Sequence, residues 1–100
     1  MSHYRNKKLL QAARGQACTA CGAAGREDVV VACHANSVAL GKGTGIKVPD
    51  YYVAYLCAFC HDLYDGRAGK LTKEERDEIW MRAYLKTVAS WFTRGIVVVP

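Results

Sequence analysis

Residues 18–61 read CTACGAAGREDVVVACHANSVALGKGTGIKVPDYYVAYLCAFCH, with one Cys-x-x-Cys pair at each end of the stretch. Two residues between paired cysteines let both sulfurs turn toward one ion at about 2.3 Å, and four thiolates complete a tetrahedral zinc site. The pairs Cys18–Cys21 and Cys57–Cys60 are therefore predicted to bind one structural zinc. The 35 residues between Cys21 and Cys57 exceed the spacing of an ordinary zinc finger, so a structural unit is expected between the pairs.

A redox-active Cys-x-x-Cys of the thioredoxin kind is the alternative interpretation of these pairs. That chemistry needs one pair beside a βαβ pattern, and it leaves the second pair unexplained. The fifth cysteine, Cys33, ends a β-branched run and is expected to be a small buried hydrophobic residue.

The length and the N-terminal sequence limit the classes of protein to which the chain can belong. A chain of 100 residues leaves little room for a second core, so one domain over residues 1–100 is expected. A domain of this size gains much of its stability from a metal or disulfide staple. The N-terminus has no apolar run or cleavage site of the signal-peptide kind, and no apolar stretch of about 18 residues occurs. The expectation is a cytoplasmic protein with no membrane role.

The charge of the chain favours a polyanionic partner. The net charge is +5 and the sequence pI is about 9.1, which makes nucleic acid the leading partner class. A merely soluble basic protein is the alternative.

The remaining pattern predicts short helices and strands in an α+β fold. The expected elements are a basic helix within residues 5–14, a strand over 28–33, a Gly-rich loop over 38–50, a strand over 51–56, a helix from 60 or 61 to 66, and a long amphipathic helix over about 72–94. The sequence Thr72-Lys-Glu-Glu75 matches a capping box and predicts the start of the long helix. Residues 96–99 are expected to form a last strand or a packed tail.

Three side chains in the predicted strand–loop–strand–helix unit could carry chemistry. His34 ends the first strand, while His61 and Asp65 stand four residues apart on the following helix and so share one face. Imidazole and carboxylate in this arrangement can bind one divalent cation. Alternatively, His61 caps its helix or is solvated, and Asp65 caps the turn at Gly66.

The order of a histidine at a strand end, a Gly-rich loop, a second strand and CxxCH opening a helix resembles the HNH, or His-Me finger, nucleases with a ββα-metal core. The segment from Cys33 to Gly66 is more specifically similar to the small YbcO-like recombination nucleases of phages and prophages. The resemblance covers roughly residues 9–95. It implies hydrolysis of DNA phosphodiester bonds with Mg²⁺ or another divalent cation, in recombination or repair, within the cytoplasm of a bacterial host cell.

The resemblance also implies roles for individual residues. His34 becomes the general base, with Asn36 or a backbone carbonyl orienting its ring. His61 and Asp65 become the ligands of the catalytic cation.

The sequence departs from the better-known HNH enzymes at two places. Cys33 stands where those enzymes often have an Asp or His ligand directly before the base. Tyr51 and Tyr52 stand where the middle Asn is expected, and Asp50 or Asn36 is the candidate to replace it. These departures leave open that His34 is itself a ligand or that catalysis has been lost.

Four basic residues are predicted to contact the nucleic-acid backbone: Lys42, Lys47, Arg14 and Arg67. The backbone around Lys42, flanked by glycines, can approach a phosphate closely. A solvated basic face is the alternative. The rival function from another class is a non-catalytic zinc module that binds nucleic acid or a protein partner, and the sequence leaves open a monomer or a homodimer.

Overall fold

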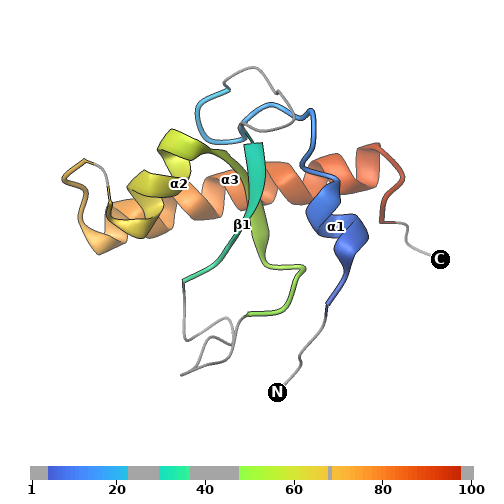
Figure 1. Ribbon diagram of the computed structural model, residues 1–100, viewed down its shortest axis with the longest axis horizontal. Helices are drawn as coiled ribbons and strands as arrows, with labels where there is room; N and C mark the ends of the chain where they lie inside the picture. The colour runs from blue at the N-terminus through green and yellow to red at the C-terminus, as the bar shows by residue number, and fades with distance from the viewer. Residues whose placement is uncertain (1–4, 23–29, 37–47, 68, 98–100) are drawn as a thin grey trace.

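The computed structural model describes residues 5–22, 30–36, 48–67 and 69–97. The described elements, in chain order, are α1 (Lys7–Gln11), β1 (Val30–His34), β2 (Val53–Cys57), α2 (Ala58–Asp65) and α3 (Lys73–Thr93). Figure 1 shows the two strands in front of the long helix α3, with α2 and α1 on opposite sides of them. The predicted α+β class is confirmed.

Strands β1 and β2 form an antiparallel pair. Val30 lies opposite Cys57 at one end of the pair, and His34 lies opposite Val53 at the other. The ladder continues past β1, because the N–H of Ala35 donates to the carbonyl of Tyr52 at 3.1 Å. This register places the second cysteine pair at one end of the sheet and His34 at the opposite end.

Helix α3 packs against β2 and supplies hydrogen-bond partners to the sheet. The hydroxyl of Thr87 accepts the N–H of Tyr55 at 3.0 Å, and Trp91 Nε1 donates to the Tyr55 hydroxyl at 2.6 Å. Trp80 Nε1 donates to the Cys33 carbonyl at 3.0 Å. All five residues of β2 are buried, so these contacts satisfy polar groups that water does not reach.

The ends of α3 are fixed by local sequence. Thr72 Oγ1 accepts the N–H of Glu75 and the Glu75 carboxylate accepts the N–H of Thr72, which confirms the predicted capping box. At the other end Gly95 has a φ of +72°, and the N–H of Ile96 donates to the Trp91 carbonyl at 2.8 Å. No described helix, α3 included, has the length and apolar character needed to cross a bilayer.

Several boundaries differ from those predicted. Strand β2 begins at Val53 rather than at residue 51, because a turn closed by the Tyr52 N–H and the Pro49 carbonyl precedes it. Helix α2 begins at Ala58 rather than at residue 60 or 61, so Cys60 lies within its first turn. Residues 96–97 form no strand and pack against the core, while residues 28, 29, 98 and 99 lie outside the described ranges.

A stack of aromatic rings joins α2, α3 and the turn before β2. Trp80 and Tyr84 stack with ring centroids 5.0 Å apart, Tyr64 also stacks on Trp80 at 6.0 Å, and Tyr52 lies 6.0 Å from Tyr84. Such ring pairs add to the stabilisation that burial provides. The stack therefore holds the turn before β2 in a defined position relative to α2.

Candidate metal centre and active site

The two cysteine pairs converge on one point. The sulfurs of Cys18, Cys21, Cys57 and Cys60 all lie within 4.8 Å of one another, the only cluster of three or more metal-binding side chains among the described residues. The Cys21 and Cys57 sulfurs are 3.7 Å apart. Tetrahedral coordination with bonds of about 2.3 Å places neighbouring sulfurs about 3.8 Å apart. The four cysteines could therefore hold one metal ion such as zinc.

The first cysteine pair is shaped by a tight turn. The N–H of Cys21 donates to the Cys18 sulfur at 3.4 Å, and Gly22, with a φ of +75°, donates its N–H to the Cys18 carbonyl at 2.8 Å. Burial raises the pKa of Cys18, but backbone N–H groups of Cys21, Cys57 and Ala20 outweigh it and lower the pKa to about 7. The turn thus favours the thiolate, which is the metal-binding form.

The second cysteine pair spans the junction of β2 and α2. Cys57 is the last residue of the strand and Cys60 lies in the first turn of the helix. Burial and hydrogen bonds with the Cys57 and Cys21 sulfurs raise the pKa of Cys60 well above its ordinary value. Metal binding at the four sulfurs must therefore release a proton, as thiolate coordination generally does.

Cys33 takes no part in this cluster. Its side chain is 2% exposed, and its thiol donates to the His34 carbonyl at 3.7 Å. Burial, followed by the charge of Asp65, raises the pKa of Cys33 to about 12. Cys33 is thus a protonated, buried residue at neutral pH, in agreement with the expected hydrophobic role.

At the opposite end of the sheet, His34 pairs with Asp50. The His34 Nε2 atom lies 2.9 Å from Asp50 Oδ1, and the two side chains are 28% and 4% exposed. Asp50 also accepts the backbone N–H of Asn6 at 2.7 Å and the Arg5 guanidinium at 3.2 Å. The sequence predicts Asn36 or a backbone carbonyl as the partner of the His34 ring, whereas the structure places Asp50 there.

The electrostatics of Asp50 determine the form of the His34 ring. Burial raises the pKa of Asp50, but the hydrogen bonds from His34 and the Asn6 N–H, with the charges of His34 and Arg5, lower it below its ordinary 3.8. The ionised carboxylate can only accept a hydrogen bond, so it favours the ring form with a proton on Nε2. In the neutral ring the Nδ1 lone pair is then left available to bind a proton.

Helix α2 presents the second pair of candidate residues on one face, as predicted. His61 Nδ1 lies 3.2 Å from Asp65 Oδ2, and the side chains are 29% and 26% exposed. Asn36 Nδ2 donates to Asp65 Oδ1 at 3.1 Å, and the Asn36 N–H donates to the Tyr64 hydroxyl. Asn36 therefore links the chain that leaves β1, two residues after His34, to the helix that carries His61 and Asp65.

Arg67 lies directly beside this pair. Its Nη2 atom is 2.9 Å from Asp65 Oδ2, 3.1 Å from Asp62 Oδ1 and 3.3 Å from His61 Nδ1. The arginine side chain is 62% exposed. Helical spacing does not predict this contact, because Arg67 lies beyond the end of α2.

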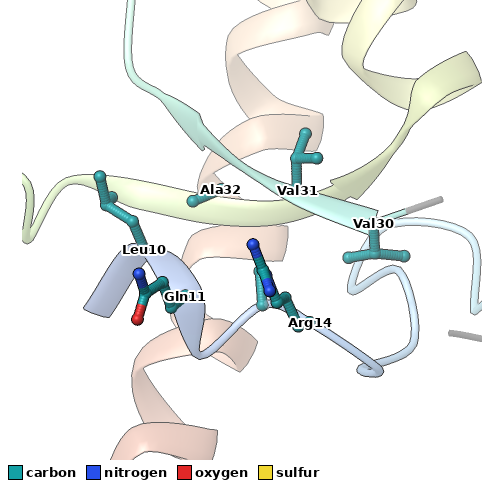
Figure 2. A pocket seen from close by; sticks show the side chains of 7 residues that line it. Leu10, Gln11, Arg14, Val30, Val31 and Ala32 are labelled. Atoms are coloured by element: carbon teal, nitrogen blue, oxygen red, sulfur yellow. The ribbon is translucent and has the colours of Figure 1, made fainter. Parts of the chain in front are cut away.

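The other basic residues are placed differently. Arg14 borders a hollow of about 340 Å³ between α1 and β1, which Figure 2 shows, and the remaining lining residues are Leu10, Gln11, Ala13, Val30, Val31 and Ala32. None of His34, Asp50, His61 and Asp65 lines this hollow. Lys42 and Lys47 lie outside the described residues.

Comparisons with known proteins give one family and one solved structure. The sequence pattern of a family described as "Putative nuclease YbcO" matches residues 7–96. A solved structure described as a putative bacteriophage protein from Escherichia coli strain K-12 matches with a TM-score of 0.64 and 24% identity, covering 87% of this chain and 99% of that chain. This likeness shows a shared fold. No curated protein matches the chain.

Proposed function

Because the chain belongs to the family described as putative nuclease YbcO, we propose that it is a metal-dependent endonuclease that hydrolyses DNA phosphodiester bonds. We assign β1, β2 and α2 to a ββα-metal unit of the HNH type and zinc to the four cysteines. The proposed setting is recombination or repair of DNA in the bacterial cytoplasm.

One observation carries the proposal. A buried, ionised Asp50 holds His34, and Asn36 connects the end of the same strand to the His61–Asp65 pair. The strand end that carries the candidate base is therefore held beside the candidate cation-binding pair through Asn36. Active sites commonly combine such groups, because proton transfer and charge stabilisation must act on the same phosphate.

His34 acts as the general base. Its Nδ1 atom takes a proton from water, and Asp50 holds the tautomer and stabilises the imidazolium that forms. Asp50 serves as a positioning residue, since it contacts the ring on the nitrogen opposite to the reacting one.

His61 and Asp65 fit a hard divalent cation. Adjacent ligands of Mg²⁺ at about 2.1 Å lie about 3 Å apart, and the His61 and Asp65 ligand atoms are 3.2 Å apart. A cation bound there supplies positive charge that stabilises the phosphate and the leaving oxygen. Two protein ligands would leave the rest of the coordination shell open to water and phosphate oxygens.

Basic residues supply affinity for the DNA backbone. We assign phosphate contacts to Arg14, Arg67, Lys42 and Lys47, in a chain whose net charge is +5. Affinity of this kind falls as salt rises, because phosphate binding releases counterions.

The test is a plasmid-nicking assay with zinc-loaded protein and added Mg²⁺ or Mn²⁺. We expect the wild-type protein to nick supercoiled DNA and His34→Ala to lower the rate by about 10²- to 10⁴-fold. Arg82→Gln is the control, because Arg82 pairs with Glu78 on the exposed face of α3 at 2.8 Å. Zinc content and circular dichroism establish that each variant is folded.

A different result supports the rival function. If the wild-type protein cleaves no supercoiled, single-stranded or branched DNA with either cation, the nuclease proposal is wrong. Retained DNA binding under those conditions would identify a non-catalytic zinc module.

A further inference from the structure

A single nitrogen of Arg67 contacts both side chains of the candidate cation pair. Its Nη2 atom lies 2.9 Å from Asp65 Oδ2 and 3.3 Å from His61 Nδ1, while these two atoms are 3.2 Å from each other. The positively charged guanidinium thus lies against the two atoms that would bind a divalent cation.

The end of α2 fixes the position of Arg67. Gly66 has a φ of +79°, and the N–H of Gly66 donates to the Leu63 carbonyl at 3.2 Å. The N–H of Arg67 donates to the Asp62 carbonyl at 2.8 Å, which completes a Schellman motif. The motif turns the chain back over the last turn of the helix. The contact of Arg67 with His61 and Asp65 is therefore a consequence of how the helix ends.

The guanidinium and a divalent cation exclude each other at this position. Both need the same lone pairs of His61 Nδ1 and Asp65 Oδ2, and two positive charges a few ångströms apart repel. The Arg67 side chain is 62% exposed, so it can leave without disturbing the core. Asp62, which is 46% exposed and lies 3.1 Å from Arg67, can keep the guanidinium close to the site.

We propose that Arg67 and the divalent cation exchange at the His61–Asp65 pair. In the cation-free protein Arg67 occupies the pair and weakens cation binding. When the cation binds, Arg67 moves to a phosphate of the nucleic acid. Phosphate and cation then strengthen each other's binding, since each favours the displaced arginine. This inference rests on the proposed function, because it takes His61 and Asp65 as cation ligands.

The first experiment measures Mn²⁺ binding by electron paramagnetic resonance, using the full zinc-loaded chain without DNA. We expect Arg67→Gln to bind Mn²⁺ about three- to tenfold more tightly than the wild type, as for loss of a few exposed ion pairs. Arg82→Gln removes the same charge from a residue that is 77% exposed and should leave the affinity within about twofold. His61→Ala should abolish binding.

The possible failures are distinguishable. If His61→Ala abolishes Mn²⁺ binding but Arg67→Gln binds no more tightly than Arg82→Gln, the exchange is wrong and the cation site stands. If His61→Ala binds Mn²⁺ as the wild type does, or no variant binds it, the cation site itself is wrong and the proposed function loses its metal ligands.

A second experiment tests where Arg67 goes. In the His34→Ala background, which is expected to slow cleavage strongly, the salt dependence of DNA binding is compared with and without Arg67→Gln. At saturating Mn²⁺ we expect Arg67→Gln to reduce the slope of log affinity against log salt by about one phosphate contact. Without divalent cation the two slopes should agree. An equal reduction in both conditions would show a permanent phosphate contact and overturn the exchange.

Discussion

Asp50 is 3% exposed and still carries its charge at neutral pH. A buried carboxylate is stable only when hydrogen bonds and charges replace its lost hydration. His34, the Asn6 N–H and Arg5 provide these partners, so three segments that are distant in the sequence meet at one side chain. The residue thus links the N-terminal segment to the candidate base.

Substitution of Asp50 should lower stability in a pH-dependent way. The folded-state pKa is below 3.8, so the contribution is present above pH 3.8 and is lost as the pH falls through the folded-state pKa. At pH 7 we expect Asp50→Asn to reduce the free energy of unfolding by about 1–3 kcal/mol. Urea denaturation of both proteins across pH provides the measurement. A difference that is already smaller at pH 5 than at pH 7 contradicts this assignment.

At the residue scale, spacing predicted some partners and not others. The four cysteines follow from two short motifs, and the His61–Asp65 pair follows from helical periodicity, because both patterns are local. The pairing of His34 with Asp50 depends on where the chain comes back to the sheet after a long connection, and no local pattern specifies that place. The same holds for Arg5, which reaches Asp50 from the N-terminal segment.

Thr87 of α3 makes hydrogen bonds both to its own helix and to the neighbouring strand β2. Its hydroxyl accepts the Tyr55 N–H from β2 and donates to the Ala83 carbonyl at 2.9 Å, and its side chain is fully buried. This polar residue in the middle of an apolar helix face therefore provides a hydrogen-bond acceptor to β2 as well as a donor to its own helix.

We expect Thr87→Val to destabilise the protein by about 1–3 kcal/mol, because the buried Tyr55 N–H loses its acceptor while the shape is kept. Thr87→Ser keeps the hydroxyl and should cost less, despite the lost methyl group. Urea denaturation of the two variants gives the comparison. Equal losses would mean that the methyl packing, and not the hydrogen bond, is what matters.

The end of α2 provides a second test at this scale. Gly66 and Gly95 both have positive φ, at +79° and +72°, so alanine at either position should cost about 1–2 kcal/mol. At Gly66 a Cβ would also lie 2.5 Å from Arg76 Nη1. We expect only Gly66→Ala to change Mn²⁺ affinity, because only that turn positions Arg67. Thermal unfolding and Mn²⁺ titration of both variants test this, and an equal Mn²⁺ affinity in both would contradict it.

The long helix was the element that the sequence predicted best. Its capping box, apolar spacing and terminal glycine are local signals that agree with one another. The predicted start of α2 lies C-terminal to the observed start. A Cys-x-x-Cys pair is typical of a turn, whereas here Cys57 directly precedes the first helical residue.

For the whole molecule, the four cysteines join the segment after α1 to the β2–α2 junction. Both segments also meet through Thr19, whose N–H donates to the Tyr55 carbonyl at 2.9 Å. A small core gains substantially from such a cross-link, since a metal bound only by the folded chain contributes its binding energy to folding.

Removal of the metal should therefore unfold the protein. Zinc binding by such sites provides about 10–16 kcal/mol, which matches or exceeds the total stability of most small domains. We expect one zinc per chain and loss of cooperative thermal unfolding after chelation. Cys60→Ala should lose the zinc, whereas Cys33→Ala should retain it. A metal-free protein that still melts cooperatively would contradict this prediction.

Helix α2 starts inside the second cysteine pair and carries His61 as the residue after Cys60. The position of the sulfur cluster consequently fixes the rotation of α2 about its own axis, and with it the direction in which His61 projects. Each added residue advances a helix by about 100°. One residue inserted between Cys60 and His61 would turn His61 and Asp65 together by more than a quarter-circle, away from Asn36, without removing a single metal ligand.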